Sequence, residues 1–303
     1  MKTLREALEA GVSRLREAGS DTPRLDAELL LGHVIGLDRT SVLAHGEAPL
    51  GDGQRAAFEE ALERRAKGEP VAYIRGVKEF YGLAFGVDAR ALIPRPETER
   101  LVELALEEIV RRLTERPRPA GTPPLRILDV GTGSGAVAVS LCVALRRRRF
   151  GSEVRLVASD DSEDALELAV ENAVSHGVAD LIDFRVADVM DPAVQVGGRA
   201  DVVVANLPYV PSAAVPDLPV AASFEPASAL DGGPDGLDVV RRLLAGLPDG
   251  LARDGTALIE IGSDQADAVR ETVATSLPGW SAGIHADLSG RPRVAVLRPP
   301  AAR

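Results

Sequence analysis

Residues 126–136 read RILDVGTGSGA, an apolar run followed by three glycines at alternate positions and the start of a second apolar segment. This pattern is typical of a β-strand that turns tightly into an α-helix. Glycine is needed in such a turn because the backbone bends sharply and must approach a ligand closely. The stretch therefore predicts an α/β fold with a nucleotide-type cofactor site at the carboxyl end of the strand.

Strand-like and helix-like segments alternate after this turn. Such alternation is typical of a parallel sheet with helices on both faces. Residues 201–206, DVVVAN, are nearly all apolar, as expected for a strand that is buried on both faces. The predicted strands lie at 126–130, 154–160, 182–188, 201–206, 256–262 and 293–298, and the predicted helices at 135–148, 162–176, 237–251 and 265–277.

The first 70 residues carry helical patterns only. Thr3 and Glu6 have the spacing of a capping box at the start of a first helix. Pro23 suits the first turn of a second helix, which ends near Gly36. A third helix is predicted at 53–67. Three short amphipathic helices predict a compact bundle.

Strand-like pieces separate the bundle from the sheet. VAYIRG, EFYGLAFGV and ALI occupy residues 71–93 and are broken by glycines, which predicts a β-hairpin. A helix from Pro96 to about Leu113 and a Pro/Gly-rich connection at 115–124 lead into the first strand of the sheet. The predicted division is a helical domain at 1–72, a hairpin linker at 73–95 and a catalytic domain at 96–303.

Composition limits the class of protein. The chain of 303 residues is 45% hydrophobic, enough for a sizeable core, and no apolar run reaches the roughly 18 residues of a membrane helix. The single cysteine, Cys142, fits a reducing cytoplasm, and the four histidines are scattered without metal-ligand spacing. A net charge of −11 disfavours direct nucleic-acid binding. We therefore expect a cytoplasmic protein without a membrane segment or a metal site.

Two acids end the next strands of the predicted sheet. Asp160 ends ASD, where its carboxylate can accept hydrogen bonds from both hydroxyls of a ribose, whereas Asp161 or Ser162 is better placed to cap the next helix. Asp188 ends VAD, where a carboxylate can accept a hydrogen bond from the amino group of adenine. Because the carboxyl ends of parallel strands meet at one edge, the glycine turn and the two acids are expected to line one crevice.

The fourth strand is followed by Asn206, Leu207, Pro208 and Tyr209. Asn206 offers a side-chain carbonyl oxygen, and Leu207 offers a main-chain carbonyl held extended by the following proline. Two acceptors at this spacing can hold both hydrogens of an NH₂ group. The lone pair of a planar nitrogen is delocalised, and acceptors aimed at its hydrogens strengthen as positive charge develops in the transition state. Tyr209 is expected to stack on the planar substrate or to face a cationic methyl group.

These features predict methyl transfer from S-adenosylmethionine to a planar amino or amide nitrogen, with S-adenosylhomocysteine as the product. Three alternatives remain on the residues alone. Gly131, Gly133 and Ala136 also satisfy the looser glycine pattern of dehydrogenases, which gives no role to 206–209. A non-catalytic adaptor with a vestigial cofactor fold is a second alternative. An rRNA or DNA amino-methyltransferase is the third, because N-L-P-Y suits it.

The chain resembles the HemK/PrmC family, which methylates the glutamine of the Gly-Gly-Gln motif in peptide-chain release factors. The resemblance implies a Rossmann-like class I methyltransferase fold with a seven-stranded, mostly parallel sheet. It also implies a helical N-terminal domain joined by a hairpin, matching residues 1–95. The segments that carry it are GVKEFYGLAF, LIPRPETERLVE (92–103), ILDVGTGSGAVAVSL, the ASD strand end, NLPYVP, FEPASALDGGPDGLDVVRRLL (224–244) and IEIGSDQ (259–265).

The resemblance also implies roles for individual residues. The N-terminal domain docks the release factor, Arg95 and Glu97 lie near the site, and we expect a monomer. The glycine turn holds the methionine part of the cofactor, Asp160 its ribose and the 188–189 pair its adenine. The implied cofactor residues are Gly131, Thr132, Gly133, Ser134, Gly135, Asp160, Asp188, Val189 and Asn206, and those at the glutamine amide are Asn206, Leu207, Pro208 and Tyr209.

The chain departs from the family pattern at two positions. Leu207 stands where proline is usual, but only its main-chain carbonyl is required, and N-L-P-Y is also the form of rRNA adenine dimethyltransferases. Val189 stands where an aromatic residue can occur, which implies weaker stacking on adenine. Four consecutive arginines, 146–149, are expected to be solvated at a helix end, where the helix dipole favours positive charge.

Overall fold

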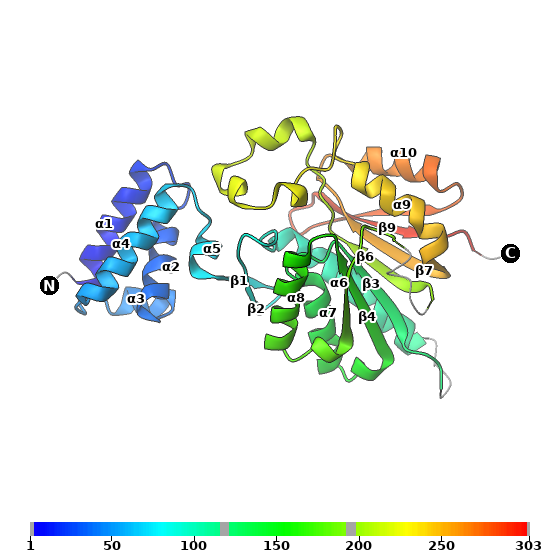
Figure 1. Cartoon of the computed structure of the whole chain (residues 1–303), viewed down its shortest axis with the longest axis horizontal. Helices are drawn as coiled ribbons and strands as arrows, with labels where there is room; N and C mark the ends of the chain where they lie inside the picture. The colour runs from blue at the N-terminus through cyan, green and yellow to red at the C-terminus, as the bar shows by residue number, and fades with distance from the viewer. Residues whose placement is uncertain (1–2, 116–120, 192–197, 302–303) are drawn as a thin grey trace. The chain divides into compact units, whose positions relative to one another are not determined.

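The computed structural model of the chain describes residues 3–115, 121–191 and 198–301, and it divides into two units (Figure 1). The first comprises Met1–Val77 with Leu218–Glu225, and the second comprises Lys78–Asp217 with Pro226–Arg303. The sequence pattern does not predict that Leu218–Glu225 groups with the helical unit. Within the described residues, we find no helix with the length and apolar character needed to cross a membrane. Residues 116–120 of the predicted connection lie outside the described residues.

The first unit is a helical bundle. The predicted capping box is confirmed, because the Thr3 hydroxyl accepts from the Glu6 amide at 3.2 Å and the Glu6 carboxylate accepts from the Thr3 amide at 3.0 Å. Pro23 begins the second helix and Gly36, with φ +70°, ends it as predicted. The helices are α1 (Leu4–Glu17), α2 (Pro23–Ile35), α3 (Arg39–Ala44), α4 (Asp52–Ala66) and α5 (Val71–Arg75), with the 3₁₀ turn η6 (Val220–Phe224).

The second unit is built on a seven-stranded sheet, as the resemblance implies. Strands β3 to β7 run parallel to one another, and β9 lies antiparallel between β7 and β8. The spatial order is β5-β4-β3-β6-β7-β9-β8: the chain proceeds from β3 to β5 in one direction, returns to β6 on the other side of β3, and so places the switch in strand order between β3 and β6. The strands are β3 (Leu125–Val130), β4 (Val154–Asp160), β5 (Ile182–Val186), β6 (Ala200–Ala205), β7 (Leu251–Glu260), β8 (Ser281–Ala286) and β9 (Pro292–Arg298).

Helices cover both faces of this sheet (Figure 1). One face carries α6, α7 and α8, and the other carries α9 and α10, whose buried leucines and valines join the strand side chains in one core. Covering on both faces explains why β3 and β6 are almost continuously buried. The helices are α6 (Glu99–Glu115), α7 (Ala136–Arg147), α8 (Glu163–Ser175), α9 (Asp238–Gly250) and α10 (Ala266–Ser276).

The region predicted as three strands forms a helix and one hairpin. The strand predicted for VAYIRG is wrong: these residues form α5, which Pro70 precedes and Gly76, with φ +66°, terminates. The predicted hairpin is confirmed as β1 (Val77–Phe80) and β2 (Leu83–Gly86). Both turn residues between them have positive φ, as a two-residue hairpin turn requires. The ALI segment at 91–93 is not a strand.

Candidate functional site

The glycine turn leaves the carboxyl end of β3 and enters α7, as predicted. Gly131 and Gly133 have φ of +69° and +54°, backbone angles that residues other than glycine rarely adopt. A Cβ at Gly133 would find its nearest neighbour, the Ala91 Cβ, only at 4.0 Å, so this glycine faces open space. The turn is tied to the next strand by a hydrogen bond of 2.9 Å from the Thr132 amide to the Ser159 carbonyl. The backbone therefore lies open to a ligand on one side and is held firmly on the other.

Two carboxylates lie against this turn. Asp160 ends β4, and its Oδ2 accepts from the Gly133 amide at 2.8 Å while its Oδ1 accepts from the Ser162 amide at 3.1 Å. Burial raises the pKa of Asp160, and these two backbone hydrogen bonds oppose the rise. Asp129 lies beneath the turn, is 1% exposed and accepts from the Thr132 hydroxyl at 2.7 Å. Burial raises the pKa of Asp129 to about 7.

The end of β5 contributes Asp188 and Val189. The Asp188 carboxylate forms an ion pair with Arg242 of α9, and all three residues line the same cavity. Val189 is 9% exposed and has φ +42°, a strained conformation for a β-branched residue of the kind that clusters at functional sites. The structure thus places an ion pair, rather than an isolated acid, at this strand end.

The end of β6 brings Asn206, Leu207 and Pro208 to the cavity. The Asn206 Nδ2 donates to the Thr98 hydroxyl at 3.1 Å. The Leu207 side chain is 5% exposed and packs against the glycine turn, since a Cβ at Gly131 would lie 3.0 Å from its Cδ2. Among the described residues, neither the Asn206 Oδ1 nor the Leu207 carbonyl accepts a hydrogen bond. Both oxygens therefore keep their capacity to accept a hydrogen bond.

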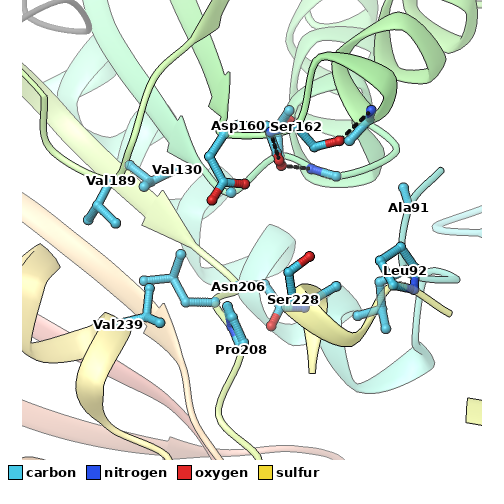
Figure 2. A pocket seen from close by; sticks show the side chains of 18 of the residues that line it. Ala91, Leu92, Val130, Asp160, Ser162, Val189, Asn206, Pro208, Ser228 and Val239 are labelled. Atoms are coloured by element: carbon cyan, nitrogen blue, oxygen red, sulfur yellow. Dashed lines mark hydrogen bonds between the residues drawn. The ribbon is translucent and has the colours of Figure 1, made fainter. Parts of the chain in front are cut away.

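These strand ends enclose one cavity of about 600 Å³, within the usual range of roughly 300–1,000 Å³ for small-molecule sites. Figure 2 shows Asp160 on one side of it, Asn206 and Pro208 on the other, and Val189 at one end. It lies where the strand order reverses between β3 and β6, the position at which open α/β sheets bind ligands. The glycine cradle, the carboxylates and the volume fit an adenosine cofactor.

Two of the predicted site residues do not line this cavity. Gly135 lies behind it, where a Cβ would come within 3.0 Å of the Ala169 Cβ, so this glycine serves the packing of α7 against α8. Tyr209 turns away from the lining: its hydroxyl donates to Glu260 at 3.4 Å and its carbonyl accepts from Gln265 at 3.0 Å. Burial and the charge of Glu260 raise the pKa of Tyr209 to about 12. Stacking of Tyr209 on a ligand has no support from this placement.

The predictions from the residues missed several members of the cavity wall. Arg242 and Val239 come from α9, and Thr98 comes from the 3₁₀ turn η1 (Pro96–Thr98). Residues 226–229 and 231–233 also line the cavity, within the FEPASALDGG segment that carries the family resemblance. Of the two residues implied to lie near the site, Arg95 lines the cavity and the exposed Glu97 does not.

Comparison with known proteins decides the family. Residues 6–76 match the model of the PrmC N-terminal domain, and residues 122–245 match that of a methyltransferase domain. The chain is 41% identical over 291 residues to the release factor glutamine methyltransferase of Moorella thermoacetica, covering 96% of both chains. It is 37% identical over 290 residues to that of Deinococcus radiodurans, again covering 96% of both chains. The chain belongs to the release factor glutamine methyltransferase family.

The fold of this family member also occurs in more distant methyltransferases. The hMettl16 catalytic domain in complex with MAT2A 3'UTR hairpin 1 superimposes with a TM-score of 0.54 at 13% identity, covering 85% of this chain and 88% of that one. That likeness concerns the fold alone. The predicted class I fold is confirmed, and the chain is an S-adenosylmethionine-dependent methyltransferase.

Proposed function

We propose that this enzyme methylates the side-chain amide nitrogen of the glutamine in the Gly-Gly-Gln motif of a peptide-chain release factor. Membership of the release factor glutamine methyltransferase family supports this assignment. The observation that carries it is the position of residues 206–208, which form one wall of the cavity that the glycine turn and Asp160 also line. Two unengaged oxygen acceptors therefore lie beside a site suited to an adenosine cofactor.

The residues proposed to hold the cofactor come from three strand ends. The backbone of residues 131–134 receives the methionine part, the Asp160 carboxylate accepts from the ribose hydroxyls, and the 188–189 pair borders adenine. Each oxygen of Asp160 accepts one backbone hydrogen bond and retains a further lone pair for a hydroxyl. S-adenosylmethionine supplies a methyl group on a positively charged sulfur as the electrophile.

Asn206 and Leu207 are proposed to hold the two hydrogens of the glutamine amide. The amide nitrogen shares its lone pair with its carbonyl group and is therefore a weak nucleophile. As the new bond forms, positive charge develops on nitrogen, and two oxygens aimed at its hydrogens bind this state more strongly than the ground state. Catalysis then rests on orientation and electrostatics and needs no strong base.

Leucine at position 207 is compatible with this role. Its side chain is buried in the core of the second unit and lies against Gly131, so the role proposed for Leu207 asks only for its main-chain carbonyl. Pro208 keeps the preceding residue extended, as it does for any residue at that position. We therefore expect the departure from the usual proline to leave the acceptor pair intact.

Further parts of the proposal concern the partner and the setting. The predicted division of the chain is a helical domain at 1–72, a hairpin linker at 73–95 and a catalytic domain at 96–303. We propose that the helical domain docks the release factor. We propose a cytoplasmic monomer that does not bind nucleic acid directly, in keeping with its net charge of −11.

Mass spectrometry of a release factor after incubation with the enzyme and isotopically labelled S-adenosylmethionine tests the proposal. One labelled methyl group is expected on the glutamine of the Gly-Gly-Gln motif, and none on a release factor in which that glutamine is glutamate. Ribosomal RNA in a parallel reaction serves as the control for the amino-methyltransferase alternative. Methyl incorporation into the RNA, with none into the release factor, would overturn the assignment.

A further inference from the structure

Glu260 is a buried carboxylate beside the site with incomplete hydrogen bonding. It ends β7, the neighbour of β6, and is 1% exposed. Its Oε1 accepts from the Tyr209 hydroxyl at 3.4 Å, whereas its Oε2 has no hydrogen-bond partner among the described residues. A buried charge that is poorly satisfied costs stability, so its presence in this position calls for a functional explanation.

Thr98 connects this carboxylate to Asn206. Thr98 is 4% exposed, its hydroxyl accepts from the Asn206 Nδ2 at 3.1 Å, and it lies close enough to Glu260 to lower the pKa of that carboxyl. A threonine hydroxyl has one hydrogen to donate, and an ionised carboxylate can only accept. A Thr98 hydrogen directed toward the ionised Glu260 carboxylate leaves a lone pair on the hydroxyl for the Asn206 amide.

This direction of hydrogen bonding determines which end of the Asn206 amide faces the cavity. With the NH₂ group held by Thr98, the Oδ1 is presented to the ligand. If the Oδ1 and Nδ2 of Asn206 exchanged places, the Asn206 NH₂ group would face the NH₂ group of the substrate. Both groups are donors, so no hydrogen bond could form between them. We propose that Thr98 and Glu260 are positioning residues that orient the Asn206 amide so that its oxygen accepts from the substrate. The inference rests on the proposed function of Asn206.

The charges around Glu260 make this arrangement sensitive to pH. The groups that face it are Thr98 and Glu97 from η1, Tyr209 after β6 and Arg293 from β9. Burial raises the pKa of Glu260 to about 7, the hydroxyls and Arg293 oppose the rise, and Glu97 adds to it. A proton on Glu260 turns the acceptor into a donor, which frees the Thr98 hydrogen to face the Asn206 oxygen.

Substitutions at Thr98 separate orientation from folding. Thr98→Val removes the hydroxyl with little change in shape, and we expect kcat to fall about 10- to 100-fold, the scale of a small misplacement at a reacting centre. The calorimetric Kd for S-adenosylmethionine is expected to stay within about three-fold, because Thr98 is proposed to act only through Asn206, and Thr98→Ser is expected to restore most of kcat. The matched control is Thr256→Val, which removes a fully buried hydroxyl that bonds Glu108 at 2.9 Å.

Substitution of Glu260 gives a readout independent of turnover. Glu260→Gln removes the buried charge, so we expect a higher melting temperature than wild type at pH 8 together with a lower kcat. We also expect the loss of wild-type activity below about pH 7 to be smaller in this variant. Asp129 has a pKa of about 7 as well, so wild type and variant are compared at each pH.

Nuclear magnetic resonance can measure hydrogen exchange of the Asn206 side-chain amide in the absence of substrate. The side-chain NH₂ signals of Asn206, identified by their loss in Asn206→Ala, are expected to exchange slowly in wild type and rapidly in Thr98→Val. Fast exchange in wild type, or kcat in Thr98→Val no lower than in Thr256→Val, would overturn the inference. Failure of wild type to methylate a release factor would instead overturn the proposed function, and the exchange measurement would still decide the orientation of Asn206.

Discussion

Replacement of Gly135 by alanine tests how the glycine turn is built. Gly135 precedes α7 with φ +78°, and a Cβ there would lie 3.0 Å from the Ala169 Cβ and 3.2 Å from the Ala169 Cα on α8. The left-handed conformation costs an alanine roughly 1–2 kcal/mol. Overpacking against a helix backbone costs about 1–3 kcal/mol more, because the neighbour cannot simply rotate away. We expect Gly135→Ala to reduce the free energy of unfolding by about 2–5 kcal/mol.

Gly177→Ala is the matched control for this substitution. Gly177 has φ +66°, but a Cβ there would have no neighbour within 4 Å, so only the backbone strain applies. Urea denaturation of both variants gives the difference in unfolding free energy, and calorimetry gives the Kd for S-adenosylmethionine of the folded protein. Equal destabilisation of the two variants would refute the packing argument. Normal stability together with weaker cofactor binding would indicate that Gly135 contributes to the cofactor site and not to helix packing.

Three further predictions address charged groups. Asp160→Ala is expected to weaken cofactor binding more than it lowers the rate at saturating cofactor. Calorimetry measures the Kd for the cofactor, and single-turnover kinetics measure the rate. A lower rate with an unchanged Kd would count against a ribose contact. Arg65→Ala leaves the carboxylate of Asp26, 5% exposed and 2.7 Å from Arg65 Nε, without its cation, and should destabilise the helical unit by about 3–5 kcal/mol in chemical denaturation. The pKa of Glu260 is about 7 in the folded state against an ordinary 4.5, so the folded state holds the extra proton between these values. The contribution of Glu260 to stability should therefore fall by about 3 kcal/mol as pH rises through this window. Asp129 contributes in both proteins, so denaturation at pH 5 and 8 should show a smaller loss in Glu260→Gln than in wild type by about this amount.

Local patterns predicted most of the fold, and the exceptions have physical causes. VAYIR is rich in residues that favour strands, yet its neighbours Pro70 and Gly76 limit it to a helical turn that buries Tyr73 and Ile74. The strand β8 was missed because SAGIHA alternates weakly and lies at the edge of the sheet, beside β9. Edge position and tertiary packing are not encoded in the hydrophobic periodicity of a short segment.

The candidate site was predictable where it follows from strand ends. Asp160, Asp188 and Asn206 meet at one edge because parallel strands present their carboxyl ends together. Contacts across long stretches of sequence were not predictable: Thr98 lies 108 residues before its partner Asn206. Nor does the sequence distinguish glycines that face a ligand from a glycine that admits a neighbouring helix.

The same limit applies to the acids. Asp188 was expected to accept from a ligand, but Arg242 lies 54 residues away in the sequence and pairs with it across the cavity rim. Glu260 ends a predicted apolar strand, and nothing in its immediate neighbours indicates that it lies beside the Tyr209 hydroxyl. The sequence predicts where side chains gather, whereas the structure is needed to identify their hydrogen-bond partners.

The single-turnover rate of Asn206→Ala at saturating S-adenosylmethionine tests the central claim most directly. If the Asn206 oxygen holds the substrate amide during methyl transfer, the rate should fall about 10²- to 10³-fold, the usual effect of removing one preorganised polar group, while the calorimetric Kd for the cofactor stays within a few-fold. An equal loss of rate and of cofactor affinity, or a rate close to that of wild type, would contradict the assignment of Asn206 to the substrate.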